Sequence, residues 1–128
     1  MEKKKRILVI EDDRDVATLL TMRLEREGFR VAVANDGETG LDKIRRSAPD
    51  LVILDLMLPG MPGEEVCKTI REDHDGRISA LPIIVLTGKT SDADRIICKV
   101  IGANSFLIKP YEVNRLFEEI VSHLPTAV

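Results

Sequence analysis

Five residues with reactive or ion-binding side chains come directly after short apolar runs of the sequence: Glu11, Asp12, Asp55, Thr87 and Lys109. An acidic residue in such a place is ordinarily a solvated loop residue or a helix cap, and Asp13 is a candidate cap of this kind. Carboxylates, a hydroxyl and an amine at the ends of four separate runs would require four such coincidences. We therefore interpret the five residues as one site.

The acidic members of this set predict a cation site. Glu11, Asp12 and Asp55 would bring three negative charges into one pocket, where mutual repulsion costs several kcal/mol. Asp55 directly ends an apolar run, so we expect it to be partly enclosed and to need a compensating charge. A divalent cation together with the Lys109 amine neutralises the three carboxylates. Oxygen ligands without histidine or cysteine favour Mg²⁺, or a similar hard cation such as Mn²⁺.

The same residue types fit transfer of a phosphoryl group to a carboxylate. Asp55 would be the nucleophile, Thr87 would offer its hydroxyl to a phosphoryl oxygen, and Lys109 would bridge the phosphoryl group and the carboxylate. A metal ion and an amine stabilise charge on the transferring oxygens, so such catalysis is mostly positioning and electrostatics.

The elements that must position these residues alternate along the chain. The apolar runs are short and rich in β-branched residues, as strands are, and cover 7–10, 30–33, 51–54, 83–86 and 105–108. After each run, apolar residues recur at helical spacing. The five stripes are Val16, Leu19, Leu20 and Leu24; Leu41, Ile44 and Ala48; Val66, Cys67 and Ile70; Ile96, Ile97, Val100 and Ile101; and Val113, Leu116, Phe117, Ile120 and Val121. Five repeats of strand and helix are predicted.

The runs 7–10, 51–54 and 83–86 are apolar throughout, which is typical of parallel strands covered on both faces. Right-handed crossovers through the helices then give a doubly wound α/β sheet, whose ligands bind beyond the carboxyl ends of the strands. Boundary residues agree with these elements: glycines at 28 and 102 end helices, and Asp36, Pro62 and Ser91 or Asp92 stand where helices begin.

Composition limits the alternatives. With 128 residues, one domain is expected, and the net charge of -3 argues against a general nucleic-acid binder. Aromatic residues make up 3%, too few for base-stacking platforms. The basic stretch 3–6 is interpreted as a solvated leader, and Cys67 and Cys98 as reduced thiols outside any disulfide or zinc site. No membrane-spanning run or signal peptide is found, so a cytoplasmic protein is expected.

Four segments carry a resemblance to a known family. They are 7–13 (ILVIEDD), 55–63 (DLMLPGMPG), 86–88 (LTG) and 102–110 (GANSFLIKP). In this order they closely resemble the receiver (CheY-like) domain of two-component response regulators. The likeness covers residues 6 to about 123, so residues 1–128 are expected to form one response regulatory domain. It implies a flavodoxin-like fold with five parallel strands in the order 2-1-3-4-5, flanked by five helices.

The resemblance also implies a role for each residue of the acidic site. Asp55 corresponds to the phospho-acceptor. Asp12 would bind Mg²⁺ directly and Glu11 through water, and Asp55 and the backbone carbonyl of Met57 would complete the protein ligands. Lys109 corresponds to the amine that contacts the phosphoryl group.

A second group of residues corresponds to the conformational switch of the family. Thr87 would move toward the phosphoryl group, with Gly88 leaving room for the movement. Phe106, where many members have Tyr, would then change rotamer. The peptide bond before Pro110 is implied to be cis.

The implied function is a phosphorylation-activated signalling switch. A phosphohistidine on a sensor histidine kinase or histidine phosphotransfer protein would donate the phosphoryl group, in a Mg²⁺-dependent reaction. The modified domain would present a changed surface to an unknown downstream protein. Such a domain catalyses its own phosphorylation and dephosphorylation and is not a turnover enzyme. Direct binding of this domain to nucleic acid or a membrane is not expected.

Several alternatives were weighed against this function. A haloacid-dehalogenase-type phosphatase needs a second aspartate where Met57 stands, and Glu11 and Asp12 would repel the phosphate of a flavodoxin-like carrier. An unphosphorylated pseudo-receiver that acts as an interaction module stays open, as does a receiver fragment of a larger regulator or hybrid kinase. Asn104 and Ser105 replace an acidic pair common in transcription-factor receivers, which favours a stand-alone or phosphorelay receiver. The stripe 96–101 is interpreted as packing on the sheet rather than as a docking surface.

Overall fold

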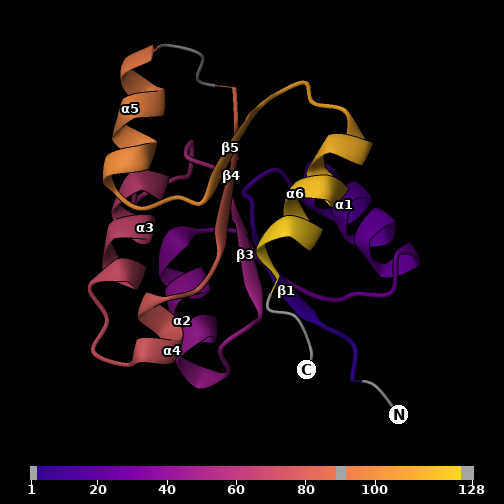
Figure 1. Ribbon diagram of the computed structural model, residues 1–128, viewed down its shortest axis with the longest axis horizontal. Coiled ribbons are helices and arrows are strands. Elements are labelled where there is room, and N and C mark those ends of the chain that lie inside the picture. The colour runs from indigo at the N-terminus through magenta and orange to yellow at the C-terminus, as the bar shows by residue number, and fades with distance from the viewer. Residues whose placement is uncertain (1–2, 89–91, 125–128) are drawn as a thin grey trace.

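The computed structural model describes residues 3–88 and 92–124. Its strands are β1 (Arg6–Ile10), β2 (Arg30–Ala34), β3 (Leu51–Leu54), β4 (Ile83–Thr87) and β5 (Ser105–Ile108). They form one parallel sheet in the order β2-β1-β3-β4-β5 (Figure 1). This is the predicted fold, with the predicted strand order.

The helices are α1 (Arg14–Arg26), α2 (Gly37–Arg46), α3 (Gly63–Arg71), α4 (Gly76–Ser79), α5 (Asp92–Val100) and α6 (Val113–His123). Five correspond to the predicted stripes. The additional helix, α4, is a single turn that was not predicted. It begins after Asp75, whose side chain accepts a 2.9 Å hydrogen bond from the backbone N–H of Arg77. One turn is too short to show a helical period in the sequence.

The helices cover both faces of the sheet. In Figure 1, α2, α3, α4 and α5 lie on one side and α1 and α6 on the other. Alternate residues of β1 point to opposite faces of the sheet. Leu8 and Ile10 pack in the core on the side of α2 to α5, and Ile7 and Val9 pack in the core on the side of α1 and α6. The continuous apolar character of β1, β3 and β4 follows from this double coverage.

Aspartate side chains fix where two of the helices begin. Asp13 accepts hydrogen bonds from the backbone N–H groups of Asp15 and Val16 at 3.0 and 3.2 Å, and so caps α1. Asp36 accepts from the N–H of Thr39 at 2.7 Å and caps α2. Both residues therefore use their carboxylates for helix capping. Ser91, a predicted helix start, lies outside the described residues.

Three predicted apolar stripes are partly wrong. In α6 the buried residues are Leu116 and Ile120, whereas Val121 is exposed. In α1 the buried face is Ala17, Leu20 and Leu24, and the Leu19 side chain is 64% exposed because its position points away from that face. In α5 the expected packing of the stripe on the sheet does not hold for Ile96, Ile97 and Val100, which are all exposed. None of the described helices is long and apolar enough to span a membrane.

Cys67 is fully buried in the core between the sheet and α3. Its thiol lies 3.4 Å from the backbone oxygen of Ile101, and burial raises the pKa of the thiol to about 11. The thiolate fraction at pH 8 is then roughly one in a thousand. We expect peptide mapping after alkylation of the native protein to leave Cys67 unmodified, and alkylation in urea to modify it. Fast labelling of Cys67 without unfolding would contradict this placement.

Candidate functional site

The predicted site residues meet at the carboxyl ends of the strands. Glu11, Asp55 and Lys109 each come one residue after β1, β3 and β5, and Thr87 is the last residue of β4. The Lys109 ammonium group lies 2.8 Å from Asp55 Oδ2 and 2.8 Å from Glu11 Oε1. One amine therefore holds carboxylates from two different strand ends.

Backbone hydrogen bonds between neighbouring strands continue one residue past the strand ends. They fix the backbone positions of Glu11, Asp55 and Lys109. Glu11 donates its N–H to the oxygen of Ala34 at 2.9 Å, and Asp55 donates its N–H to the oxygen of Ile10 at 3.1 Å. Lys109 does the same with the oxygen of Thr87, at 2.8 Å. These bonds tie the site to the sheet, and side chains on a rigid element are what a preorganised site requires.

Burial divides the acidic residues into two kinds. Glu11 and Asp55 are 4% and 7% exposed, whereas Asp12 lies on the surface. One carboxylate oxygen from each of the three can be chosen so that all lie within 4.8 Å of one another. Three oxygens at this separation could hold a hard cation.

The pKa values of Glu11 and of Lys109 are both shifted at this site. Burial raises the pKa of Glu11, and the charge of Asp55 adds to this, although the hydrogen bond from Lys109 acts in the opposite direction. Burial alone would lower the pKa of Lys109. The hydrogen bonds and charges of Asp55 and Glu11 outweigh burial, so the pKa of Lys109 is raised. The amine is therefore firmly protonated and supplies a fixed positive charge to the site.

The turn after β3 orients the Asp55 carboxylate. Its Oδ1 accepts a 2.9 Å hydrogen bond from the backbone N–H of Met57, while Oδ2 accepts from Lys109. The Met57 side chain is 60% exposed and points away from the core. Farther along the turn, the N–H of Gly63 donates to the oxygen of Leu56 at 3.1 Å, which closes the loop onto the start of α3.

Gly63 must be a glycine for this turn to close. A Cβ atom at position 63 would lie 2.5 Å from the backbone oxygen of Asp55 and 2.5 Å from the Cα of Leu56. We expect Gly63→Ala to displace the Asp55 backbone and to lower the free energy of unfolding by about 2 kcal/mol, measured by urea denaturation.

Gly76→Ala is the matched control, since a Cβ there would meet no atom within 4 Å. It should change stability by less than about 1 kcal/mol. An equal loss of unfolding free energy in both variants would show that the close contact at Gly63 does not cause the destabilisation.

The remaining predicted site residues lie around this centre. Thr87 is fully buried, and Phe106 is half-buried and packs against the core on the α2 to α5 side. A Cβ at Gly88 would meet no described atom within 4 Å. The Lys109-Pro110 peptide bond is cis.

Two contacts of the site were not foreseen from the sequence. The Asn35 side-chain amide donates a 3.0 Å hydrogen bond to the backbone oxygen of Glu11, and so ties the turn after β2 to the acidic site. The backbone N–H of Asp13 donates to Glu11 Oε2 at 3.4 Å. The position of Asn35 at a strand end, like that of the five predicted residues, was the only signal available for it.

Comparison with known proteins identifies a family. The profile of the response regulator receiver domain family matches residues 7–121. The DNA-binding response regulator MtrA of Mycolicibacterium paratuberculosis is 41% identical over 121 residues, which are 94% of this chain and 52% of that protein. MtrA of Mycobacterium leprae matches equally well. The chain thus spans about half the length of the curated relatives it matches.

Solved structures give the same result for the fold. The BeF3-activated N-terminal receiver domain of Klebsiella pneumoniae RstA is 33% identical, with a TM-score of 0.86 over 95% of this chain and 100% of that chain. A CheY-like receiver domain protein from Methanospirillum hungatei is 28% identical, with a TM-score of 0.86 over 94% of this chain and 93% of that one.

Proposed function

The chain belongs to the response regulator receiver domain family, and from this membership we propose that Asp55 is the residue at which it is phosphorylated. The observation that carries the proposal is the placement of the Asp55 carboxylate. It is nearly buried, lies beside two other acidic residues, and is held 2.8 Å from the Lys109 amine. An oriented carboxylate next to a fixed positive charge is suited to attack a phosphorus atom.

The oxygen donors at this site fit Mg²⁺, or Mn²⁺. Asp12, Asp55 and the backbone carbonyl of Met57 would bind the ion directly. Glu11 would act through water, which is the role that the resemblance to the receiver family implies for it. When bound, the ion supplies positive charge to the transferring phosphoryl oxygens.

In the proposed reaction, an oxygen of Asp55 forms a bond to phosphorus while the bond between phosphorus and the phosphohistidine nitrogen of the donor breaks. The N–H of Met57 and the Lys109 amine hold the carboxylate in place, and Lys109 also stabilises charge on the phosphoryl group. The donor would be a sensor histidine kinase or a histidine phosphotransfer protein. The domain thus promotes its own modification and is a switch rather than a turnover enzyme.

The switch residues are assigned within the same proposal. Phosphorylation adds charge and three strong acceptor oxygens beside the end of β4, where Thr87 stands. Thr87 would move toward these oxygens, and Phe106 would occupy the space that it leaves. Thr87 pairs with Ile108 and Val85 pairs with Phe106, so β4 is in direct contact with the strand that carries Phe106. The changed surface would then bind a downstream protein.

Incubation with acetyl phosphate tests the proposal directly. We expect an acid-labile adduct with the mass of one phosphoryl group, formed with Mg²⁺ and not formed when EDTA replaces Mg²⁺. Intact-mass spectrometry detects it, and peptide mapping after reduction with borohydride locates it at Asp55. An unmodified protein would support the pseudo-receiver alternative, and an adduct at another residue would overturn the assignment.

A further inference from the structure

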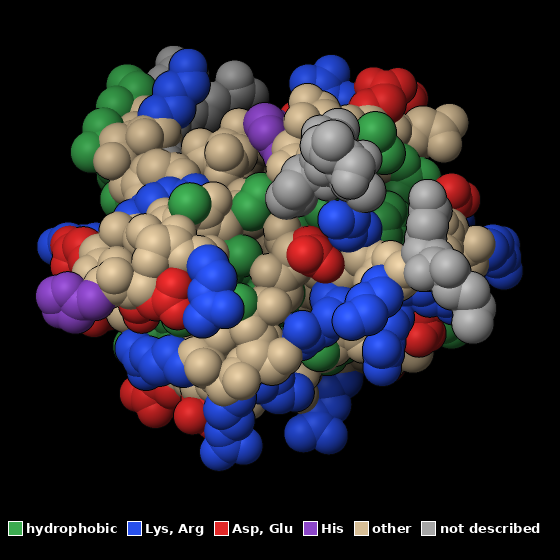
Figure 2. Space-filling view, turned by 60° about the horizontal axis from the view of Figure 1, so that its bottom comes forward, with side chains coloured by type: hydrophobic (Ala, Val, Ile, Leu, Met, Phe, Trp, Pro, Cys, Tyr) green, Lys and Arg blue, Asp and Glu red, His purple; other side chains and the backbone are tan. Residues whose placement is uncertain are grey.

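The end of the molecule opposite the acidic site carries a concentration of positive charge. Three adjoining hollows lie there, between the N-terminal ends of β1 and β2, the C-terminal half of α2 and the loop that precedes β3. They are lined by nine of the 19 Lys and Arg residues of the chain and by two of its 22 acidic residues. Figure 2 shows Lys and Arg side chains, in blue, gathered across one face. We call this surface the basic face.

The basic face is assembled from segments that are far apart in the sequence. The stretch 3–6 meets Arg30 at the start of β2, Arg45 and Arg46 at the end of α2, and Arg77 in α4. In the sequence alone the stretch 3–6 had the character of a solvated leader. The charged residues that surround this stretch in space are mostly Lys and Arg. Their charges add to those of residues 3–6 and make the local electrostatic potential more positive.

Arg46 and Arg77 pair with Asp42 and Asp75, but two other cations of the face are held in place without being neutralised. The Arg6 guanidinium donates to the backbone oxygens of Ser47 and Ala48 at 3.2 and 3.4 Å, and the Lys43 amine donates to the oxygen of Val33 at 2.6 Å. Backbone carbonyls carry no net charge, so these contacts fix the side chains and leave their positive charge for a ligand.

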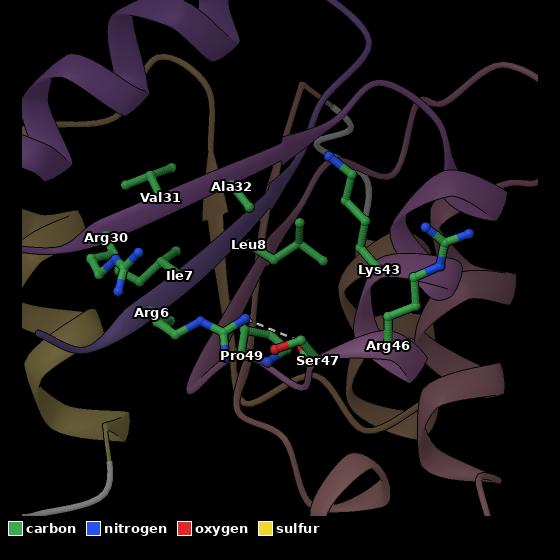
Figure 3. A pocket seen from close by; sticks show the side chains of 10 residues that line it. All are labelled: Arg6, Ile7, Leu8, Arg30, Val31, Ala32, Lys43, Arg46, Ser47 and Pro49. Carbon is green, nitrogen blue, oxygen red and sulfur yellow. Dashed lines mark hydrogen bonds between the residues drawn. The ribbon is translucent and has the colours of Figure 1, made fainter. Parts of the chain in front are cut away.

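The hollow at the edge of the sheet has an apolar floor. It has a volume of about 550 Å³ and is lined at its base by Leu8 and Ala32, with Arg30, Lys43 and Arg46 around it (Figure 3). Because Ala32 is small, it leaves room above the floor. β2 is an edge strand, so the hollow is open along one side and a chain can pass through it.

We propose that the basic face binds an extended acidic segment of a partner protein, in which carboxylates alternate with small apolar side chains. The carboxylates would pair with Arg30 and Lys43, and an apolar side chain would enter the hollow over Ala32. The three hollows adjoin at Arg6 and together offer more length than a compact ligand would fill. No aromatic residue lines them, so bases have nothing to stack on, and the apolar floor has no role in binding phosphates.

Binding of a fluorescein-labelled peptide of alternating Glu and Val residues tests this by fluorescence anisotropy. The unphosphorylated wild-type protein is used, so the outcome does not depend on the assignment of Asp55. We expect saturable binding that weakens as salt is added. Arg30→Glu should weaken binding about tenfold, because it reverses a charge at the rim of the hollow.

Lys99→Glu, an equal change of charge on exposed α5, is the matched control and should weaken binding less than about twofold. Ala32→Met fills the hollow without changing charge and should also weaken binding. The proposal is overturned by an absence of binding, by equal effects of Arg30→Glu and Lys99→Glu, or by equal affinity for a Glu-Ser peptide. Tighter binding of duplex DNA or of phosphatidylserine vesicles than of the peptide would overturn it as well.

Discussion

Asp55→Asn is expected to abolish the phosphoryl adduct that the wild-type protein forms with acetyl phosphate and Mg²⁺. The amide has the size of the carboxylate, and its single oxygen can still accept from the N–H of Met57, so the turn should keep its geometry. Its NH2 group cannot accept from Lys109, so that hydrogen bond is lost. It lacks the charged oxygen that attacks phosphorus. Intact-mass spectrometry at matched times should show no adduct on the variant.

The same substitution should leave the fold intact. In Mg²⁺-free buffer it relieves the repulsion of Asp55 with Glu11 and Asp12 but removes a partner of Lys109, so we expect stability to change by no more than about 1 kcal/mol. Mg²⁺ at ten times its dissociation constant should stabilise the wild type by about 1.4 kcal/mol and the variant by less. Urea denaturation with and without Mg²⁺ measures both effects.

Asp42→Asn is the control, since Asp42 is an exposed residue of α2 that pairs with Arg46 away from the acidic site. It should form the adduct at the wild-type rate and keep the full stabilisation by Mg²⁺. An undiminished adduct on the Asp55 variant would remove Asp55 from the acceptor position, and a loss of the adduct in both variants would show that the assay reports general charge.

The sequence predicted the sheet because its strands are buried on both faces. β1, β3 and β4 therefore have continuous apolar runs, and the polar residue that ends each run marks the edge at which the site lies. The approach of Glu11, Asp55 and Lys109 follows from parallel strands that end at the same level. These features depend on local composition and strand direction, both of which the sequence carries.

What the sequence did not predict depends on distances between segments. Nothing in the residue type of Gly63 shows that its Cα lies against the backbone of Asp55, and the basic face exists only because the fold brings 3–6, Arg30 and α2 together. The apolar spacing in α5 predicts a helix, but it does not predict which of these residues face the sheet. The exposure of Ile96 and Val100 was therefore not predicted. Periodicity identifies an amphipathic helix, whereas its partner is set by tertiary packing.

Lys109→Ala is expected to have the largest effect on stability. The Lys109 amine compensates two nearly buried carboxylates at 2.8 Å each, and its removal leaves Glu11 and Asp55 facing each other without a cation. Removing one partner of a buried ion pair typically costs 3–5 kcal/mol, and we expect a loss of about 3 kcal/mol in Mg²⁺-free buffer. Mg²⁺ should restore part of this loss, because it neutralises the same carboxylates.

Lys68→Ala is the matched control, since the Lys68 amine makes a 3.9 Å pair with Glu72 on the surface of α3. This substitution should lower the free energy of unfolding by less than about 1 kcal/mol.

The pH dependence of stability separates the charge of Lys109 from the packing of its side chain. The pKa of Lys109 is raised in the folded protein, so its stabilisation is complete below the unfolded pKa of about 10.4 and is lost as pH rises through the higher folded value. The difference between wild type and Lys109→Ala should therefore be constant from pH 7 to about 9 and shrink above about 10.4. A difference that persists unchanged at higher pH would mean that Lys109 stabilises the fold through its aliphatic stem.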